Sequence, residues 1–181
     1  MGVRELHPQY TYSDYVQWEG DWELIEGEAW AMAPAPSIEH QSISLTIASM
    51  LKQALEMCPA CKALMEVDYK IDEFTTLRPD VLVACHIPRK APYVDHTPEM
   101  IFEVVSPSTK QKDRTVKYRI YRDNGVKYYI LVDPKATLAE IYELDERSGE
   151  YRLTHEAVDE TISFEFGKCR IDFAFSRIWE D

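Results

Sequence analysis

The spacing of apolar residues along the chain predicts both helices and strands. Residues 38–57 carry apolar side chains at intervals of three and four, which is the period of an amphipathic helix. Two shorter runs, Arg78–Ala84 and Met100–Val105, are dense in apolar residues, as are strands of a sheet that is covered on both faces. A short helix is expected at 12–19, and further strands at 22–26, 28–32, 62–71, 126–132, 137–144, 150–157 and 169–173.

The segment after the second apolar run predicts a crossover connection. Ser106–Thr109 can cap a helix that runs to about Asn124, and Gly125 stands where a glycine commonly ends a helix. A strand at 126–132 follows. Strand, helix and strand in this order indicate parallel neighbours, and the later strands indicate an antiparallel extension. We therefore expect an α+β fold, in which helices flank a mixed sheet.

Length and composition are typical of one globular domain. The chain has 181 residues, of which 45% are hydrophobic and 12% aromatic, so we expect a single domain over residues 1–181. No apolar run is long enough to span a membrane, and Met1–Leu6 lacks the apolar core of a signal peptide. The expectation is a cytoplasmic protein with no membrane partner.

The formal net charge of −12 is unfavourable for a protein that handles nucleic acid. The charge is unevenly distributed, because residues 109–127 hold seven lysines and arginines against two aspartates. Such a basic segment could steer a phosphate group to one site, or it could be a solvated helix face. Charge alone does not decide between these alternatives.

Cys58 and Cys61 form a Cys-x-x-Cys pair, which is half of a zinc knuckle or a redox motif. A zinc site would need a second pair at similar spacing, and Cys85 and Cys169 do not supply one. A thioredoxin-like pair stands at the start of a helix, whereas this pair follows the predicted helix. We therefore expect ordinary reduced cysteines, with a redox or zinc protein as the weaker alternative.

Two carboxylates stand in or beside apolar strands. Asp80 follows Pro79 at the head of one run, and Glu103 lies inside the next. A buried carboxylate is costly unless it is paired or binds a cation. Lys117 and Tyr121 flank the apolar stripe of the helix that follows, where Lys117 can meet Glu103. Asp80, Glu103 and Lys117 predict a divalent-metal site suited to phosphodiester hydrolysis. A structural ion pair between Glu103 and Lys117 is the alternative.

Several motifs occur together over most of the chain: Glu23–Glu28, Pro36, His40, Pro79–Asp80, Phe102–Thr109, Asp113, Lys117, Tyr121, Gly125–Val126 and Tyr128–Pro134. This set resembles the Uma-two family of predicted restriction endonucleases, which belongs to the PD-(D/E)XK nuclease superfamily. The resemblance implies a restriction-endonuclease-like core and an endonuclease that acts on DNA. It assigns Asp80 and Glu103 as metal ligands. The superfamily's lysine would fall at Val105, and the resemblance places it instead at Lys117.

Four further residues are accessory candidates. His40, at the start of a helix, could touch the site or a phosphate, or it could cap the helix or fill the core. Glu39 or Glu26 could supply a further acidic ligand, as the first helix does in some nucleases of the superfamily. Tyr121 is more typical of core packing than of chemistry.

These residues lead to a functional hypothesis. We expect Mg²⁺ or Mn²⁺ as cofactor, held by Asp80, Glu103 and the backbone carbonyl of Val104 or, alternatively, of Val105, because hard oxygen ligands suit these ions. Lys117 would orient the attacking water or stabilise the transition state. The alternative is a catalytically silent nuclease-fold module that binds or regulates, which the net charge favours.

A homodimer is expected on two grounds. Cutting both strands of a duplex calls for two active sites, and two-fold dimers are the commonest oligomers. The C-terminal part is also rich in aromatic residues that one chain of this size cannot easily bury, unless they complete a single core. These residues are Tyr142, Tyr151, Phe164, Phe166, Phe173, Phe175 and Trp179.

Overall fold

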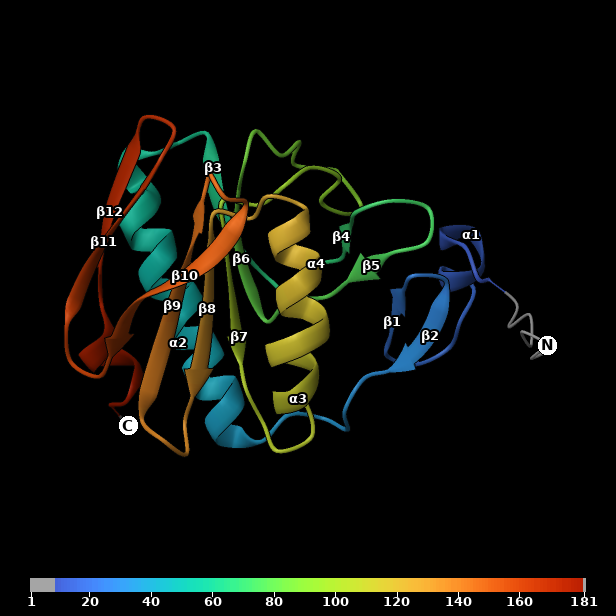
Figure 1. The fold of residues 1–181 in the computed structure, drawn as a ribbon, viewed down its shortest axis with the longest axis horizontal. Helices are drawn as coiled ribbons and strands as arrows, with labels where there is room; N and C mark the ends of the chain where they lie inside the picture. The colour runs from blue at the N-terminus through green and yellow to red at the C-terminus, as the bar shows by residue number, and fades with distance from the viewer. Residues whose placement is uncertain (1–8, 181) are drawn as a thin grey trace.

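A six-stranded mixed sheet lies at the centre of the computed structural model, which describes residues 9–180 (Figure 1). Its strands follow the order β10-β9-β8-β7-β6-β3. β7 and β8 pair in parallel across the predicted helical crossover, and the other neighbours are antiparallel. The bounds are Cys61–Met65 for β3, Val81–Cys85 for β6, Met100–Val104 for β7, Tyr128–Asp133 for β8, Leu138–Asp145 for β9 and Glu150–Ala157 for β10.

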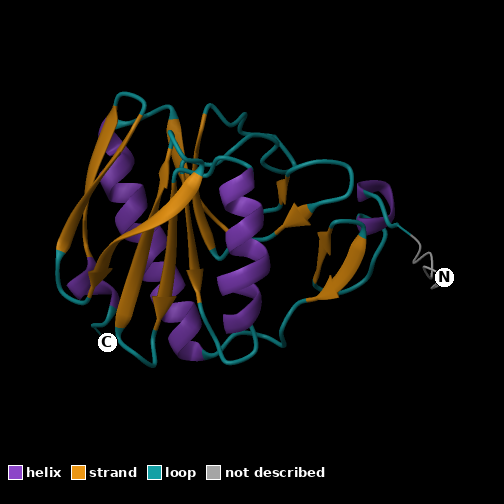
Figure 2. Ribbon diagram, viewed as in Figure 1, coloured by secondary structure: helices purple, strands orange, loops and turns teal. Residues whose placement is uncertain are grey.

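One face of the sheet packs against α2 (Ile38–Ala54), which η1 (Leu55–Met57) extends. The hairpin of β11 (Thr161–Phe166) and β12 (Cys169–Ala174) and the turn η3 (Phe175–Ile178) complete this layer (Figure 2). The expected 38–57 helix is confirmed, because its apolar stripe is buried against the sheet.

The opposite face packs against a helical segment made of α3 (Lys110–Lys112), the π-helical turn η2 (Asp113–Lys117) and α4 (Tyr118–Asp123). Gly125 follows with φ of 76°, a conformation that glycine adopts without steric cost. A smaller four-stranded sheet lies beside this segment, in the order β2-β1-β5-β4. Its strands are β1 (Trp22–Ile25), β2 (Glu28–Ala31), β4 (Tyr69–Lys70) and β5 (Thr76–Leu77), and the short helix α1 (Tyr12–Tyr15) packs against β1.

Helices therefore flank both faces of a mixed sheet, with an antiparallel extension, and this predicted fold class is confirmed. The expected strand at 62–71 is two strands of different sheets, because Glu66 adopts φ of 48° and turns the chain out of β3. The first helix is shorter than expected and ends at Tyr15. β5 and β11 were not predicted, although β11 alternates exposed and buried residues.

The C-terminal aromatic residues complete the core of one chain. Phe164, Phe173 and Phe175 are fully buried, and the Phe173 ring lies 5.5 Å from that of Phe102 on β7. The homodimer therefore loses this part of its support and stays a prediction.

Within residues 9–180, no helix is both long and apolar enough to cross a membrane. The segment Met1–Leu6, on which the expectation about a signal peptide rested, lies outside the described residues.

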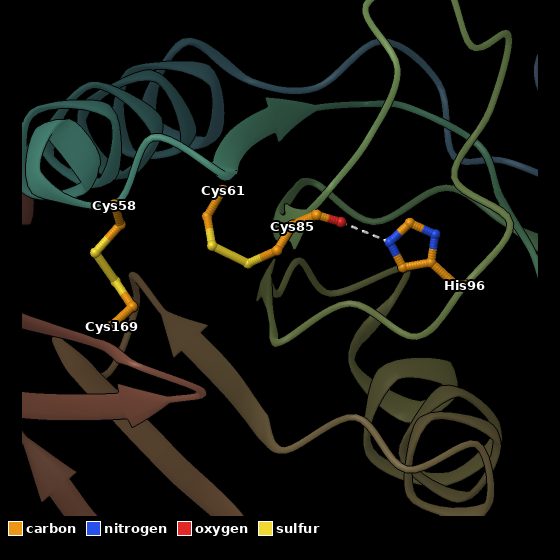
Figure 3. The surroundings of a disulfide bond; sticks show 5 residues. All are labelled: Cys58, Cys61, Cys85, His96 and Cys169. Atoms are coloured by element: carbon orange, nitrogen blue, oxygen red, sulfur yellow. Dashed lines mark hydrogen bonds between the residues drawn. A yellow bond between two sulfur atoms is a disulfide. The ribbon is translucent and has the colours of Figure 1, made fainter.

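The prediction of reduced cysteines is wrong for this structure. Cys58 is bonded to Cys169, and Cys61 is bonded to Cys85 (Figure 3). Cys61 and Cys85 stand directly opposite each other on β3 and β6, so pairing of these strands brings their sulfurs together. Cys58 ends η1 beside the start of β12, a contact between segments 111 residues apart that sequence spacing does not reveal.

Candidate active site

Asp80 and Glu103 meet because of the register between β6 and β7. Val81 stands opposite Phe102, so Asp80, one residue before β6, comes across from Glu103. Both carboxylates lie on the face of the sheet that packs against α4. Asp80 stands two residues from Leu82 and Glu103 two residues from Ile101, and residues two apart on a strand share a face. Adjacent strands thus bring together two acidic residues that are 23 positions apart.

A cavity of about 330 Å³ opens beside these two residues. It lies between the Met32–Ser37 segment that leads into α2 and the Ser106–Thr109 loop that follows β7. All three predicted catalytic residues line this cavity. Other charged or titratable residues in its wall are His40, Glu66, Arg78, Lys112 and Asp113.

Lys117 is buried at the centre of an acidic cluster. Its Nζ lies 2.8 Å from Glu103 Oε1, 3.0 Å from Glu23 Oε1 and 3.9 Å from Asp113 Oδ1. Burial lowers the pKa of Lys117, but the charges of Glu103, Glu23 and Asp113 outweigh burial and raise that pKa well above its usual range. Lys117 therefore remains a cation at neutral pH.

Glu103 shares one oxygen between two donors. Its Oε1 accepts hydrogen bonds from Lys117 Nζ and from the Tyr121 hydroxyl, at 2.8 and 2.9 Å. Burial raises the pKa of Glu103 well above its usual range, although Lys117 acts in the opposite direction. Tyr121 is fully buried, so it packs in the core and also contacts the site.

Glu23 belongs to this cluster and was not among the predicted site residues. It is fully buried on β1 and accepts hydrogen bonds from Lys112 Nζ at 2.7 Å and from the Arg78 backbone N–H at 2.9 Å. Burial raises the pKa of Glu23, but the charges of Lys117 and Lys112 outweigh burial and lower it. The signal in the sequence was the one used for Glu103, a carboxylate within an apolar strand.

Asp113 is the second residue that the prediction left out of the site. It lies in the π-helical turn η2 with Lys117, is only 2% exposed, and its Oδ1 has no hydrogen-bond partner among the described residues. Burial raises its pKa. Single π-helical turns inside helices are frequent at functional sites, because they change the direction of side chains. Here the turn places both Asp113 and Lys117 in the cavity wall.

Asp80 is held by a group on the neighbouring strand β7 and by one on α2. Its Oδ2 accepts a hydrogen bond from the Val104 backbone N–H at 2.7 Å and lies 3.3 Å from His40 Nε2. Burial lowers the pKa of His40, but the hydrogen bond and charge of Asp80 outweigh burial and raise it. The backbone of His40 also donates to the Ser37 hydroxyl that caps α2. His40 therefore touches the candidate site through its side chain.

The carboxylates of the cavity fit a divalent cation. Glu103 and Asp113 in the cavity wall are buried with Lys117, and Glu23 is buried behind it; three carboxylates thus surround Lys117, the one buried cation of the described residues. The hydrogen bonds to Asp80 and Glu103 all go to one oxygen of each, Oδ2 and Oε1, which leaves Oδ1 and Oε2 for a ligand. No group of three histidine, cysteine, aspartate or glutamate side chains in the described part of the chain could hold a metal ion. Mg²⁺ is commonly bound by one or two carboxylates, with waters completing its shell.

The structure does not bring every predicted residue to this cavity. Glu26, in the turn between β1 and β2, makes a bidentate ion pair with Arg119 at 2.9 Å and is exposed. Glu39 and Val105 line a neighbouring cavity of about 660 Å³. Val104 does line the first cavity, and its N–H is already bonded to Asp80.

The expected basic segment is paired within the protein. Of the seven lysines and arginines at 109–127, six form ion pairs with carboxylates, and Lys127 donates to the backbone carbonyl of Glu165. Two of them, Lys112 and Lys117, line the cavity. The segment is therefore neither a free cationic surface nor a simple solvated face.

Comparisons with known proteins agree with the fold. The family model described as "Uma2: Putative restriction endonuclease" matches residues 12–166. The chain is 29% identical over 161 residues to "Uncharacterized protein slr1290" of Synechocystis sp., covering 84% of this chain and 83% of that protein. The fold is similar to a crystal structure described as "a putative nuclease belonging to DUF820" from Anabaena variabilis. The TM-score is 0.75 and the identity 17%, over 93% of this chain and 97% of the other.

Replacing Lys117 tests how strongly the acidic cluster depends on its cation. Lys117→Met should lower the free energy of unfolding by about 3–5 kcal/mol at neutral pH, because Glu23 and Glu103 lose a buried partner. The matched control is Lys52→Met at an exposed position of α2, where the change should stay within about 0.5 kcal/mol. Urea unfolding monitored by circular dichroism measures both values.

The same variant should show a defined pH dependence. Without Lys117, the pKa of folded Glu103 lies further above its unfolded value of about 4.3, so the folded state binds more protons between these two pKa values. Stability relative to the wild type should therefore fall as pH rises from the folded pKa of Glu103 in the wild type to its higher folded pKa in the variant. A deficit that is the same at about pH 5 and about pH 8 would contradict this account.

Proposed function

Because the chain belongs to the Uma2 family of restriction-endonuclease-like proteins, we propose that it is a metal-dependent endonuclease that hydrolyses DNA phosphodiester bonds. The observation that carries this proposal is the position of Asp80 opposite Glu103 across β6 and β7, beside the buried Lys117. Among residues 9–180, hydrogen bonds reach only one oxygen of each carboxylate. Paired carboxylates with a nearby cation match the needs of phosphoryl-group hydrolysis.

Asp80 and Glu103 would hold Mg²⁺ or Mn²⁺, together with the backbone carbonyl of Val104 or, alternatively, of Val105. Of these two carbonyl donors we favour Val104, because it lines the same cavity as both carboxylates. The chemistry that such an ion supplies when bound is activation of water and neutralisation of charge on the phosphate. His40 and the Val104 N–H hold Asp80 in its orientation.

Lys117 would act electrostatically rather than as a base. Its ammonium is kept protonated by Glu103 and Glu23, so it cannot accept a proton from water at neutral pH. A fixed ammonium beside the cavity can orient the attacking water or stabilise the extra negative charge of the transition state. Glu23 would hold both Lys117 and Lys112 at the cavity wall.

A second candidate function is a catalytically silent nuclease-fold module that binds or regulates. The net charge of −12 and the ion pairing of the basic segment favour this alternative, because a stand-alone nuclease must hold a polyanion. The free carboxylate oxygens of Asp80 and Glu103 favour the enzyme.

We also propose that residues 1–181 act as one domain and that the protein works in the cytoplasm.

Cleavage of DNA tests the proposed chemistry directly. Asp80→Asn and Glu103→Gln should each lower the rate at least about 100-fold in the presence of Mn²⁺, because each removes a charged ligand without changing side-chain shape. Glu26→Gln is the matched control and should cut as the wild type does, since Glu26 lies outside the cavity. Plasmid, linear duplex and single-stranded DNA serve as substrates.

Unfolding curves of each variant show whether a loss of cleavage is a loss of folding. If Asp80→Asn cuts as fast as the wild type, the activity belongs to another site or to a contaminant. If the wild type cuts none of the three substrates with either metal, the silent module becomes the better account.

We further propose a homodimer, so that two cavities can act on the two strands of a duplex. The support is this functional argument alone, since five of the seven aromatic residues of the C-terminal part are buried within one chain and Tyr142 and Trp179 are half-buried. Light scattering at micromolar concentration should give twice the chain mass of 21.1 kDa. A single species at the chain mass, unchanged when DNA is added, would remove the dimer.

A further inference from the structure

A second cavity, of about 660 Å³, adjoins the candidate active-site cavity. The two cavities share four wall residues, which belong to the start of α2 and to the loop after β7: Ser37, His40, Ser106 and Pro107. The wall of the second cavity also contains Lys110, Asp133 and Lys135, which are absent from the wall of the first. A ligand in the active-site cavity can therefore continue into the second cavity along the shared wall.

Asp133 holds Lys110 directly and Lys135 through the turn that follows β8. Its Oδ2 accepts a hydrogen bond from Lys110 Nζ at 2.9 Å, and its Oδ1 accepts one from the Ala136 backbone N–H at 3.2 Å. Burial raises the pKa of Asp133, but the hydrogen bonds from Lys110 and Ala136 outweigh burial and lower it, so Asp133 stays charged. The turn after β8, the start of α2 and α3 lie at the same end of the sheet (Figure 1).

Both lysines keep hydrogen-bond donors for a ligand. The Lys110 side chain is 53% exposed, and its bond to Asp133 uses one of the three donors of an ammonium group. Lys135 is exposed and forms no ion pair within residues 9–180. The hydroxyl groups of Ser37 and Ser106 add two neutral donors in the shared wall. Glu39, in the first turn of α2, is exposed and opposes the lysines.

We propose that the second cavity binds a phosphodiester group of the same nucleic-acid strand, beside the group that lies at Asp80 and Glu103. The inference rests on the proposed function, because a strand with its scissile phosphate in the first cavity must continue beyond it. Each phosphodiester carries one negative charge, and proteins bind such groups through lysines and hydroxyl groups. Lys110 and Lys135 supply the charge, and Asp133 is a positioning residue.

A structural cross-link is the competing account of the ion pair between Lys110 and Asp133, since the pair joins α3 to the end of β8. Lys135 separates the two accounts. A cross-link would not need Lys135, which has no carboxylate partner within residues 9–180, whereas a phosphate subsite would use both lysines. Because Lys135 is exposed, its replacement leaves the folded core intact.

DNA binding without divalent metal tests the subsite apart from cleavage. Fluorescence anisotropy of a short labelled duplex in EDTA should show that Lys110→Gln and Lys135→Gln each bind at least about five-fold more weakly at about 0.1 M salt. Each should also lower the slope of log affinity against log salt by about 1. Glu39→Gln should bind more tightly, because it removes a negative charge from the same wall. Lys168→Gln, outside both cavities, is the matched control and should bind as the wild type does.

Cleavage in Mn²⁺ gives a second measurement. Lys110→Gln and Lys135→Gln should raise KM and leave kcat within about two-fold, because the lost contact is the same in the ground state and the transition state. A duplex with uncharged methylphosphonate links should bind equally to the wild type and to Lys135→Gln, since it offers no charge to the subsite.

Lysine variants that match the wild type in affinity and in KM would overturn the proposal, even if the wild type cuts DNA. A wild type that binds no DNA would also overturn it, as would a lysine effect that persists with the methylphosphonate duplex. If no DNA is cut but binding of ordinary DNA still depends on Lys110 and Lys135, the proposed nuclease activity fails and the phosphate subsite stands.

Discussion

The burial of one lysine among three carboxylates governs the arrangement of the candidate site. Lys117 joins Glu103 on the central sheet, Glu23 on the smaller sheet and Asp113 in its own helical turn. Desolvation opposes burial of each of these charges, so each depends on the others. The small N-terminal sheet is thereby tied to the central sheet by ion pairs as well as by apolar packing. A cavity wall with an excess of acid follows from the same cluster.

Local patterns in the sequence predict the central part of this arrangement. Asp80 and Glu103 were found because a carboxylate beside or inside an apolar strand demands a partner, and Lys117 because a helical stripe placed it on the buried face. The structure brings these three together. Glu23 carried the same local signal, but its strand belongs to a separate sheet, and its contact with Lys112 spans 89 residues. Asp113 stands four residues before Lys117 on the same helical stripe, but a position on the stripe does not by itself tell a cavity residue from a core residue.

Outside the candidate site, the features that sequence patterns did not reveal share a physical cause. They depend on contacts between segments that are distant in sequence. The disulfide of Cys58 with Cys169 depends on how the C-terminal hairpin packs on α2. The same packing buries Phe173, so an excess of aromatic residues did not signal a dimer surface. The basic segment could not be interpreted from sequence for the same reason, because the cations of the helical crossover are paired across the chain with Glu23, Glu26, Glu140 and Glu150. Ion pairing changes a basic sequence into a nearly neutral surface.

The central claim is that Asp80 and Glu103 form a divalent-metal site. Calorimetric titration of Mn²⁺ into the oxidised chain tests this claim most directly. In that chain all four cysteines are in disulfides, so no thiol can bind the metal. The account predicts saturable binding at millimolar or lower metal concentration, which is lost in Asp80→Asn and Glu103→Gln and retained in Glu26→Gln. Folded wild-type protein that binds no Mn²⁺ at millimolar concentration, or that binds it equally well without either carboxylate, would contradict the account.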